Sequence, residues 1–159
     1  MSEQDPIVIV GSARTPMGGM MGDFTPVTAS QLGSGAIEAA LQRAGINGDD
    51  VDEVIMGNVL GAGQGQAPAR QASKGAGIPD AVGATTINKM CGSGMKAAMF
   101  GHDLLVAGSA QVVVAGGMES MTNAPYLLEK ARAGMRLGHG EIKDHMFLDG
   151  LEDAYDKGL

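Results

Sequence analysis

Four short apolar segments recur along the chain, and segments with helical periodicity separate them. Residues 7–10 form a continuous apolar run after a proline, which is typical of a strand buried on both faces. Three further short runs of mostly β-branched and apolar residues predict strands. They lie at residues 54–56, 85–87 and 112–115.

Helix signals occupy the intervals between these runs. Thr28 and Gln31 have the spacing of a capping box, so we expect a helix there that Gly45 closes. Pro68 stands at a first-turn position and predicts a short helix through about Lys74. A third helix is expected from the only cysteine, residue 91, to a left-handed cap at residue 108.

The predicted order is β-α-β-α-β-α-β, which indicates an α/β fold with a mostly parallel sheet. Ligands of such sheets bind outside the carboxyl ends of the strands, where the loops at 57–65, 88–92 and 116–118 should converge. We expect this α/β unit to occupy residues 1–120. Residues 121–159 read as an excursion from the sheet, with a short helix at 124–133 and an irregular loop at 134–140.

Composition narrows the function classes. The formal charge is −7 with no block of Lys or Arg, so nucleic acid is not an expected partner. A single cysteine excludes an internal disulfide and lacks the companions of a zinc site, so no metal is expected. No apolar run approaches the roughly 20 residues of a membrane span, and the chain is predicted to be soluble and cytoplasmic. Most of the 12 methionines should fill the core, with Met90 and Met118 as exceptions.

Cys91 is the candidate catalytic residue. It stands between a predicted strand and a helix N-terminus, where free backbone N–H groups and the helix dipole stabilise a thiolate. The alternative is a buried structural cysteine. A base is missing, because His102 lies about 16 Å along the same helix at ~1.5 Å per residue. His139 and His145 are expected to be solvated loop residues, and residues 61–65 a flexible turn rather than a phosphate cradle.

Five stretches together resemble the thiolase family, in particular its biosynthetic-type acetyl-CoA acetyltransferases. They are residues 12–16 (SARTP), 61–72 (GAGQGQAPARQA), 87–97 (INKMCGSGMKA), 115–126 (AGGMESMTNAPY) and 149–151 (DGL). The resemblance implies the thiolase fold and acyl transfer between CoA thioesters. The reaction would be Claisen condensation or the reverse thiolysis, through an acyl-cysteine, with CoA as part of the substrate and no separate cofactor.

The resemblance also implies roles for individual residues. Cys91 would be the nucleophile, with its backbone N–H donating to the thioester oxyanion. Met90, Gly117 and Met118 match positions close to the reacting acyl group, and Leu151 matches a position that contacts CoA. Leu159 departs from the pattern, because many acetoacetyl-CoA thiolases carry a histidine near CoA at that position.

The chain matches only the N-terminal part of a thiolase. The family's C-terminal half supplies an activating histidine, a second cysteine and an asparagine-containing loop. We therefore expect this half as a partner, covalently joined or as a companion chain, and residues 121–159 as the start of the CoA-binding loop insertion. Homodimers through the strand at 85–87, or tetramers through the loop after Glu119, are also implied. The alternative is a non-catalytic, truncated thiolase-like interaction module.

Overall fold

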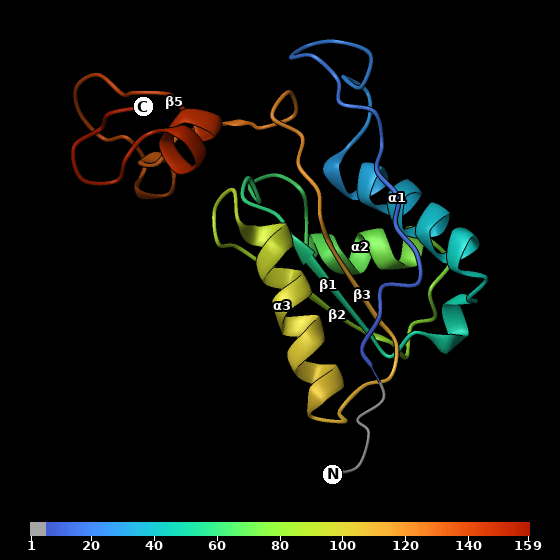
Figure 1. The fold of residues 1–159 in the computed structure, drawn as a ribbon. Coiled ribbons are helices and arrows are strands. Elements are labelled where there is room, and N and C mark those ends of the chain that lie inside the picture. The colour runs from blue at the N-terminus through green and yellow to red at the C-terminus, as the bar shows by residue number, and fades with distance from the viewer. Residues whose placement is uncertain (1–5) are drawn as a thin grey trace.

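The computed structural model describes residues 6–159, and three parallel strands form its centre (Figure 1). β1 (Glu53–Gly57) lies in the middle, between β2 (Gly83–Ile87) and β3 (Val113–Gly117). The last residues of the three strands pair with one another, so their carboxyl ends lie at one level. The α/β class and the parallel sheet are confirmed.

The first helix, α1 (Ala29–Ala44), has the boundaries that the sequence predicts. The Thr28 hydroxyl accepts a hydrogen bond from the Gln31 backbone N–H, and the Gln31 side chain accepts one from the Thr28 N–H. At the other end, Gly45 adopts the left-handed conformation with φ of 69°. Both caps are made by residues within four positions of the helix end, which is why local sequence identifies them.

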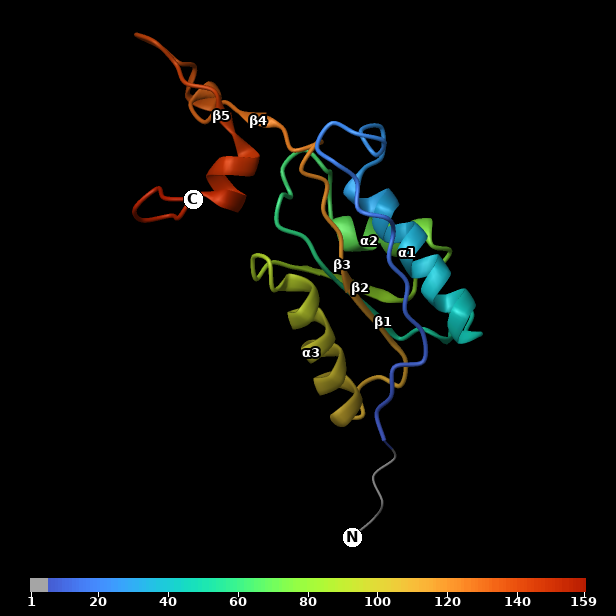
Figure 2. The same cartoon turned by 45° about the horizontal axis from the view of Figure 1, so that its top comes forward.

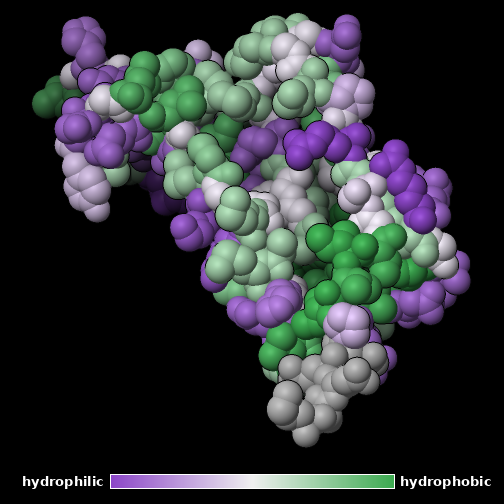
Figure 3. All heavy atoms as spheres, in the orientation of Figure 1, coloured by the Kyte–Doolittle hydropathy of each residue, from purple (hydrophilic) through white to green (hydrophobic). Residues whose placement is uncertain are grey.

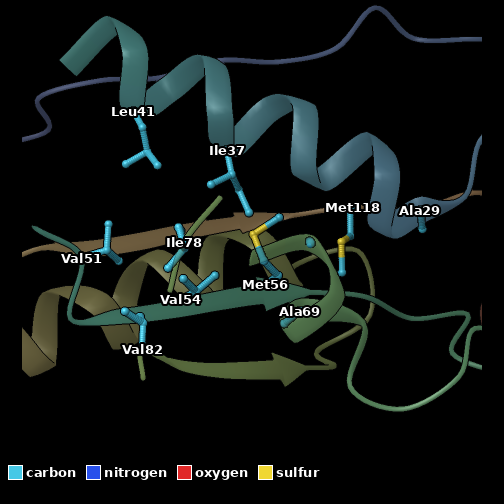
Figure 4. Packing of buried hydrophobic residues seen from close by; sticks show 11 residues of the cluster. Ala29, Ile37, Leu41, Val51, Val54, Met56, Ala69, Ile78, Val82 and Met118 are labelled. Carbon is cyan, nitrogen blue, oxygen red and sulfur yellow. The ribbon is translucent and has the colours of Figure 1, made fainter. Parts of the chain in front are cut away.

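The other two helices are α2 (Pro68–Gly75) and α3 (Ser93–Val106), which cover opposite faces of the sheet (Figures 1 and 2). Met56 packs into the core that α1 and α2 enclose (Figure 4), whereas its neighbour Gly57 faces Ser93 at the start of α3. Consecutive residues of a strand point to opposite faces, so this pair assigns α3 to the face opposite the core.

The strand predicted at residues 7–10 is wrong. These residues have no regular secondary structure, and Ile9 is 91% exposed. The next residues lie against α1 instead, since Arg43 donates to the Ser12 carbonyl at 2.6 Å and Gly11 sits beside the Ala40 carbonyl. A continuous apolar run predicts burial, but a strand also needs a partner edge in register, and the run itself does not encode one.

Beyond the sheet, the chain makes a small excursion at one end of the molecule (Figure 1). β4 (Tyr126–Leu127) and β5 (Lys143–Asp144) pair there as antiparallel strands. The helix predicted at 124–133 is therefore wrong, and only the 3-10 turn η2 (Ala131–Ala133) remains of it. Pairing with a segment 16 or more residues away overrides the local helix preference. The irregular loop at 134–140 is confirmed.

Two short helical elements complete the described chain. The 3-10 turn η1 (Gly48–Asp50) leads from α1 into β1. The π-helix η3 (Phe147–Leu151) follows β5 in the excursion. No helix among residues 6–159 has the length and apolar character needed to cross a membrane.

Asp52 joins the start of β3 to the start of β1. Its Oδ2 accepts hydrogen bonds from the backbone N–H groups of Gln111 at 2.6 Å and Val112 at 3.0 Å. These two bonds lower the pKa of the Asp52 carboxyl below its usual value. The Asp52 carboxylate thus binds a proton less readily in the folded state than in the unfolded state.

The stabilisation from Asp52 should be complete above the unfolded-state pKa of about 3.9 and disappear as pH falls through the lower folded-state value. Asp52→Asn should therefore lower the thermal unfolding midpoint at pH 7. The difference from the unmodified protein should shrink below about pH 4. Thermal melts of the two proteins between pH 7 and pH 3 measure their unfolding midpoints. If the difference between the midpoints stays constant across this range, the Asp52 carboxylate does not stabilise the fold through these two bonds.

Candidate functional site

Three loops meet at the carboxyl ends of the strands, as the sequence predicts. The hydrogen bonds of the sheet continue one residue beyond it, since Asn58 N donates to the Ile87 carbonyl at 3.0 Å. Likewise, Met118 N donates to the Gly57 carbonyl at 2.9 Å. These bonds hold the loop after β1, the Cys91 loop and the turn after β3 side by side.

Cys91 lies in a tight turn that precedes α3, and its side chain is exposed. The expected start of the helix at Cys91 is wrong by two residues, since α3 begins at Ser93 with Gly92 as its N-cap. The Ser93 hydroxyl donates to the Met90 carbonyl at 2.5 Å and accepts from Lys89 N at 2.8 Å. This side chain closes the turn that carries the cysteine, and Cys91 itself is exposed.

The turn holds Met90 in an unusual conformation, with φ of 49°. Such a left-handed conformation costs a non-glycine residue about 1–2 kcal/mol. The Asn88 side chain offsets part of this cost, because its Oδ1 accepts from Met90 N at 2.9 Å. The side chain of Met90, the residue that precedes Cys91, is exposed. Its contact with an acyl group stays a prediction.

Gly57 lets α3 approach the sheet closely, and Gly94 and Gly117 lie in contact with each other beside it. A Cβ on Gly57 would lie 2.5 Å from the Ser93 Cβ and 2.8 Å from the Gly94 N. A Cβ on Gly117 would lie 3.4 Å from the Gly94 Cα. The N-terminus of α3 therefore rests on the backbone at the ends of β1 and β3, and this contact fixes the position of the Cys91 turn.

Gly117 and Met118 point to opposite faces of the sheet. Gly117 faces α3, on the side of the cysteine, whereas Met118 is 7% exposed and belongs to the core with α1 (Figure 4). The Met118 sulfur lies against Gly33, where a Cβ would come within 2.6 Å of it. The expectation that most methionines fill the core is wrong, since eight of the 12 are exposed, and Met118, the expected exception, does fill it. Its predicted place near the acyl group has no support from these contacts.

Leu151 ends the π-helix η3 in the excursion, and its side chain is exposed. The residue before it packs near the sheet, because a Cβ on Gly150 would lie 3.1 Å from the Leu60 Cδ2. The structure thus brings the segment of Leu151 next to the loop after β1. The predicted contact with CoA stays a prediction.

Glu119 organises the loop after β1, and sequence reasoning missed it. Its carboxylate accepts hydrogen bonds from the Asn58 side chain at 2.7 Å, Val59 N at 2.8 Å and Leu60 N at 3.0 Å. The Gln64 side chain donates to Asn58 Oδ1 and the Leu60 carbonyl. Instead of the flexible turn expected at 61–65, the loop is tied at several points. A carboxylate two residues after the end of a strand, at the edge where the loops converge, is the sequence signal for such a role.

The three histidines have different surroundings. His102 is exposed on α3 beside Asp103, as predicted, and His139 is exposed in the excursion. His145 is buried, so the expectation of a solvated loop residue is wrong there. Within residues 6–159 no side chain makes a hydrogen bond to the Cys91 thiol, and no three His, Cys, Asp or Glu side chains gather as metal ligands would.

Comparison with known proteins gives one consistent result. A family model described as the thiolase N-terminal domain matches residues 7–159. An acetyl-CoA acetyltransferase of Schizosaccharomyces pombe is 51% identical over 150 residues, which cover 94% of this chain and 38% of the relative. Acetyl-CoA acetyltransferase 2 of Arabidopsis thaliana is 55% identical over 149 residues, covering 94% of this chain and 37% of that protein.

A solved structure agrees with these matches. The Acat5 thiolase of Ascaris suum, crystallised in complex with coenzyme A, superimposes with a TM-score of 0.90 at 36% identity. The match covers 94% of this chain and 38% of the Acat5 chain, so the protein described here spans well under half the length of its relatives. Because the family's N-terminal domain model accounts for nearly every residue and the fold agrees, the chain belongs to the thiolase family.

Proposed function

We propose that this chain is the part of an acetyl-CoA acetyltransferase that carries the nucleophile, and that it works together with a C-terminal half. The observation that carries the proposal is the exposed thiol of Cys91, held in a closed turn directly before α3. The relatives named acetyl-CoA acetyltransferase support the substrate class.

The reaction would proceed in two steps. In the first, Cys91 loses its proton to a base and its sulfur attacks the acetyl carbonyl carbon of acetyl-CoA. The bond from that carbon to the CoA sulfur breaks, and CoA leaves with the proton. The backbone N–H of Cys91 is the proposed donor to the transient oxyanion.

In the second step, a base removes a proton from the acetyl methyl group of another acetyl-CoA. The resulting carbanion attacks the acyl-cysteine, so a carbon–carbon bond forms and the bond to the Cys91 sulfur breaks. The products are acetoacetyl-CoA and the free cysteine, which regains the proton. Thiolysis is the same sequence reversed, and CoA is part of the substrate in both directions.

The surface supports a C-terminal half as partner. Apolar side chains are exposed along residues 7–10 and on the outer face of α3, where Met95 is 74% exposed. Figure 3 shows a continuous hydrophobic area, in green, on the lower part of this face of the molecule. Apolar patches of this kind mark interaction surfaces. The same half would supply the base that the described residues do not place near Cys91.

We further propose homo-oligomers, dimeric through β2 or tetrameric through the loop after Glu119. β2 lies at the edge of the sheet, and Thr85 on this strand is exposed. An edge strand offers unpaired backbone groups to a second strand.

Trapping the acyl-enzyme tests the proposed function. The assembled protein, meaning this chain together with its C-terminal half, is incubated with acetyl-CoA alone. It is then digested at low pH and examined by mass spectrometry. The peptide that contains Cys91 should carry one acetyl group. If no peptide is acetylated and iodoacetamide modifies Cys91 only slowly at pH 7, the non-catalytic interaction module becomes the better explanation.

A further inference from the structure

His145 connects the excursion to the loop after β1. Its backbone N–H donates to the Pro125 carbonyl at 3.2 Å, and the residue is 5% exposed. The ring makes two polar contacts. Its Nε2 accepts from the Ala62 backbone N–H at 3.2 Å, and its Nδ1 lies 2.6 Å from Asp149 Oδ2.

The two contacts define the tautomer of the neutral ring. A backbone N–H is always a donor, so Nε2 must present a lone pair to Ala62. The proton of a neutral imidazole then sits on Nδ1, where the Asp149 carboxylate accepts it. His145 therefore acts as a bridge with one accepting end and one donating end.

Apolar contacts around this bridge give it a context. Pro125 lies over Gly63, where a Cβ would be 3.4 Å away, and Gly150 lies against Leu60. The excursion thus touches the loop after β1 at three places, and the bond from Ala62 to His145 is the polar one. On its other side, the same loop is held by Glu119. The loop is fixed between the end of β3 and the excursion.

We propose that His145 is a positioning residue that docks residues 143–151 onto the loop after β1, and so sets the place of Leu151 relative to Cys91. The proposal rests on the proposed function, because Leu151 matters only if this segment contacts CoA. It assigns the recognition of CoA to a segment whose position depends on one buried imidazole. Residues 58–65 contain no charged side chain. The carboxylate of Asp149 is therefore the charged group that orients the ring.

Two substitutions separate the two contacts of the ring. His145→Asn places its amide near the position of Nδ1, so it keeps a donor for Asp149 but does not reach Ala62. His145→Gln is longer, and its carbonyl oxygen can accept from Ala62 N. His139→Asn is the control, since it removes an exposed histidine from the same excursion.

Two measurements on the assembled protein test the proposal. Hydrogen exchange of the Ala62 amide should become about 3- to 10-fold faster in His145→Asn, the range expected for one lost hydrogen bond. The dissociation constant of coenzyme A, measured by calorimetry without turnover, should rise by a similar factor, about 3- to 10-fold. His145→Gln and His139→Asn should stay within about twofold of the unmodified protein.

The outcomes are distinct. Unchanged exchange at Ala62 in His145→Asn would overturn the bridge itself. Faster exchange with an unchanged coenzyme A affinity would make His145 a purely structural residue and overturn the positioning role. Neither measurement depends on acetyl transfer, so a failure of the proposed reaction, seen as absence of the acetylated Cys91 peptide, is told apart from a failure of this inference.

Discussion

Replacing Cys91 with serine should reduce acetyl transfer by the assembled protein by about 10⁴-fold or more, the scale seen when a covalent nucleophile is removed. Serine is a much weaker nucleophile than cysteine, because a hydroxyl gives up its proton far less readily than a thiol. The exposed side chain is nearly isosteric, so folding should be unaffected. The rate of acetoacetyl-CoA formation measures the effect.

The matched control for this prediction is His102→Gln. His102 lies on the same helix and is exposed, at a distance that keeps it from the thiol. This variant should retain the full rate. Thermal unfolding of both variants verifies that any loss is chemical. If the serine variant keeps a tenth or more of the activity, Cys91 is not the nucleophile, and the proposed mechanism fails.

Features encoded by neighbouring residues could be predicted from the sequence. The boundaries of α1 follow from Thr28, Gln31 and Gly45, all of which make bonds within the helix end. α2 likewise begins at Pro68, where a missing N–H costs nothing. The three observed strands follow from short apolar runs, and the convergence of their loops follows from parallel connectivity. The location of Cys91 at the carboxyl ends of the strands could therefore be predicted.

Features that depend on partners far away in the sequence could not be predicted. Ala62 and His145 are 83 residues apart, and Glu119 bonds Val59 across 60. A histidine or glutamate in a polar segment looks the same whether it is solvated or buried against a backbone N–H. The strand prediction at residues 7–10 is wrong for a related reason, because an exposed apolar run is as typical of an interface as of a strand. Burial of polar groups is decided by tertiary packing.

The glycines between α3 and the sheet also have a role that the sequence does not reveal. A sequence shows that Gly57, Gly94 and Gly117 end strands or begin a helix, but flexibility is the ordinary explanation for each. Only the structure shows that Gly94 and Gly117 face each other, so that a Cβ on Gly117 would lie 3.4 Å from the Gly94 Cα. At Gly57, where a Cβ would come within 2.5 Å of Ser93, the contact with α3 requires the absence of a side chain rather than backbone freedom.

Gly57→Ala should destabilise the protein by about 1–3 kcal/mol, the usual cost of overpacking. The new methyl group would lie 2.7 Å from the Ser93 carbonyl carbon and 2.8 Å from the Gly94 N, and backbone atoms cannot rotate away. α3 must shift, carrying the Cys91 turn with it. Misplacement of a reacting group by about 1 Å costs about 10²-fold in rate. Urea unfolding and the rate of Cys91 acetylation, measured where the variant is folded, report the two effects separately.

Gly35→Ala provides the contrast, because a Cβ on Gly35 meets nothing within 4 Å. Gly35 lies inside α1, where alanine is preferred over glycine by about 1 kcal/mol, so this variant should be more stable and equally active. Opposite signs for the same chemical change would show that contact with α3, not glycine content, sets the requirement at position 57. If Gly57→Ala were as stable and as active as the unmodified protein, the close seating of α3 would not be what positions Cys91.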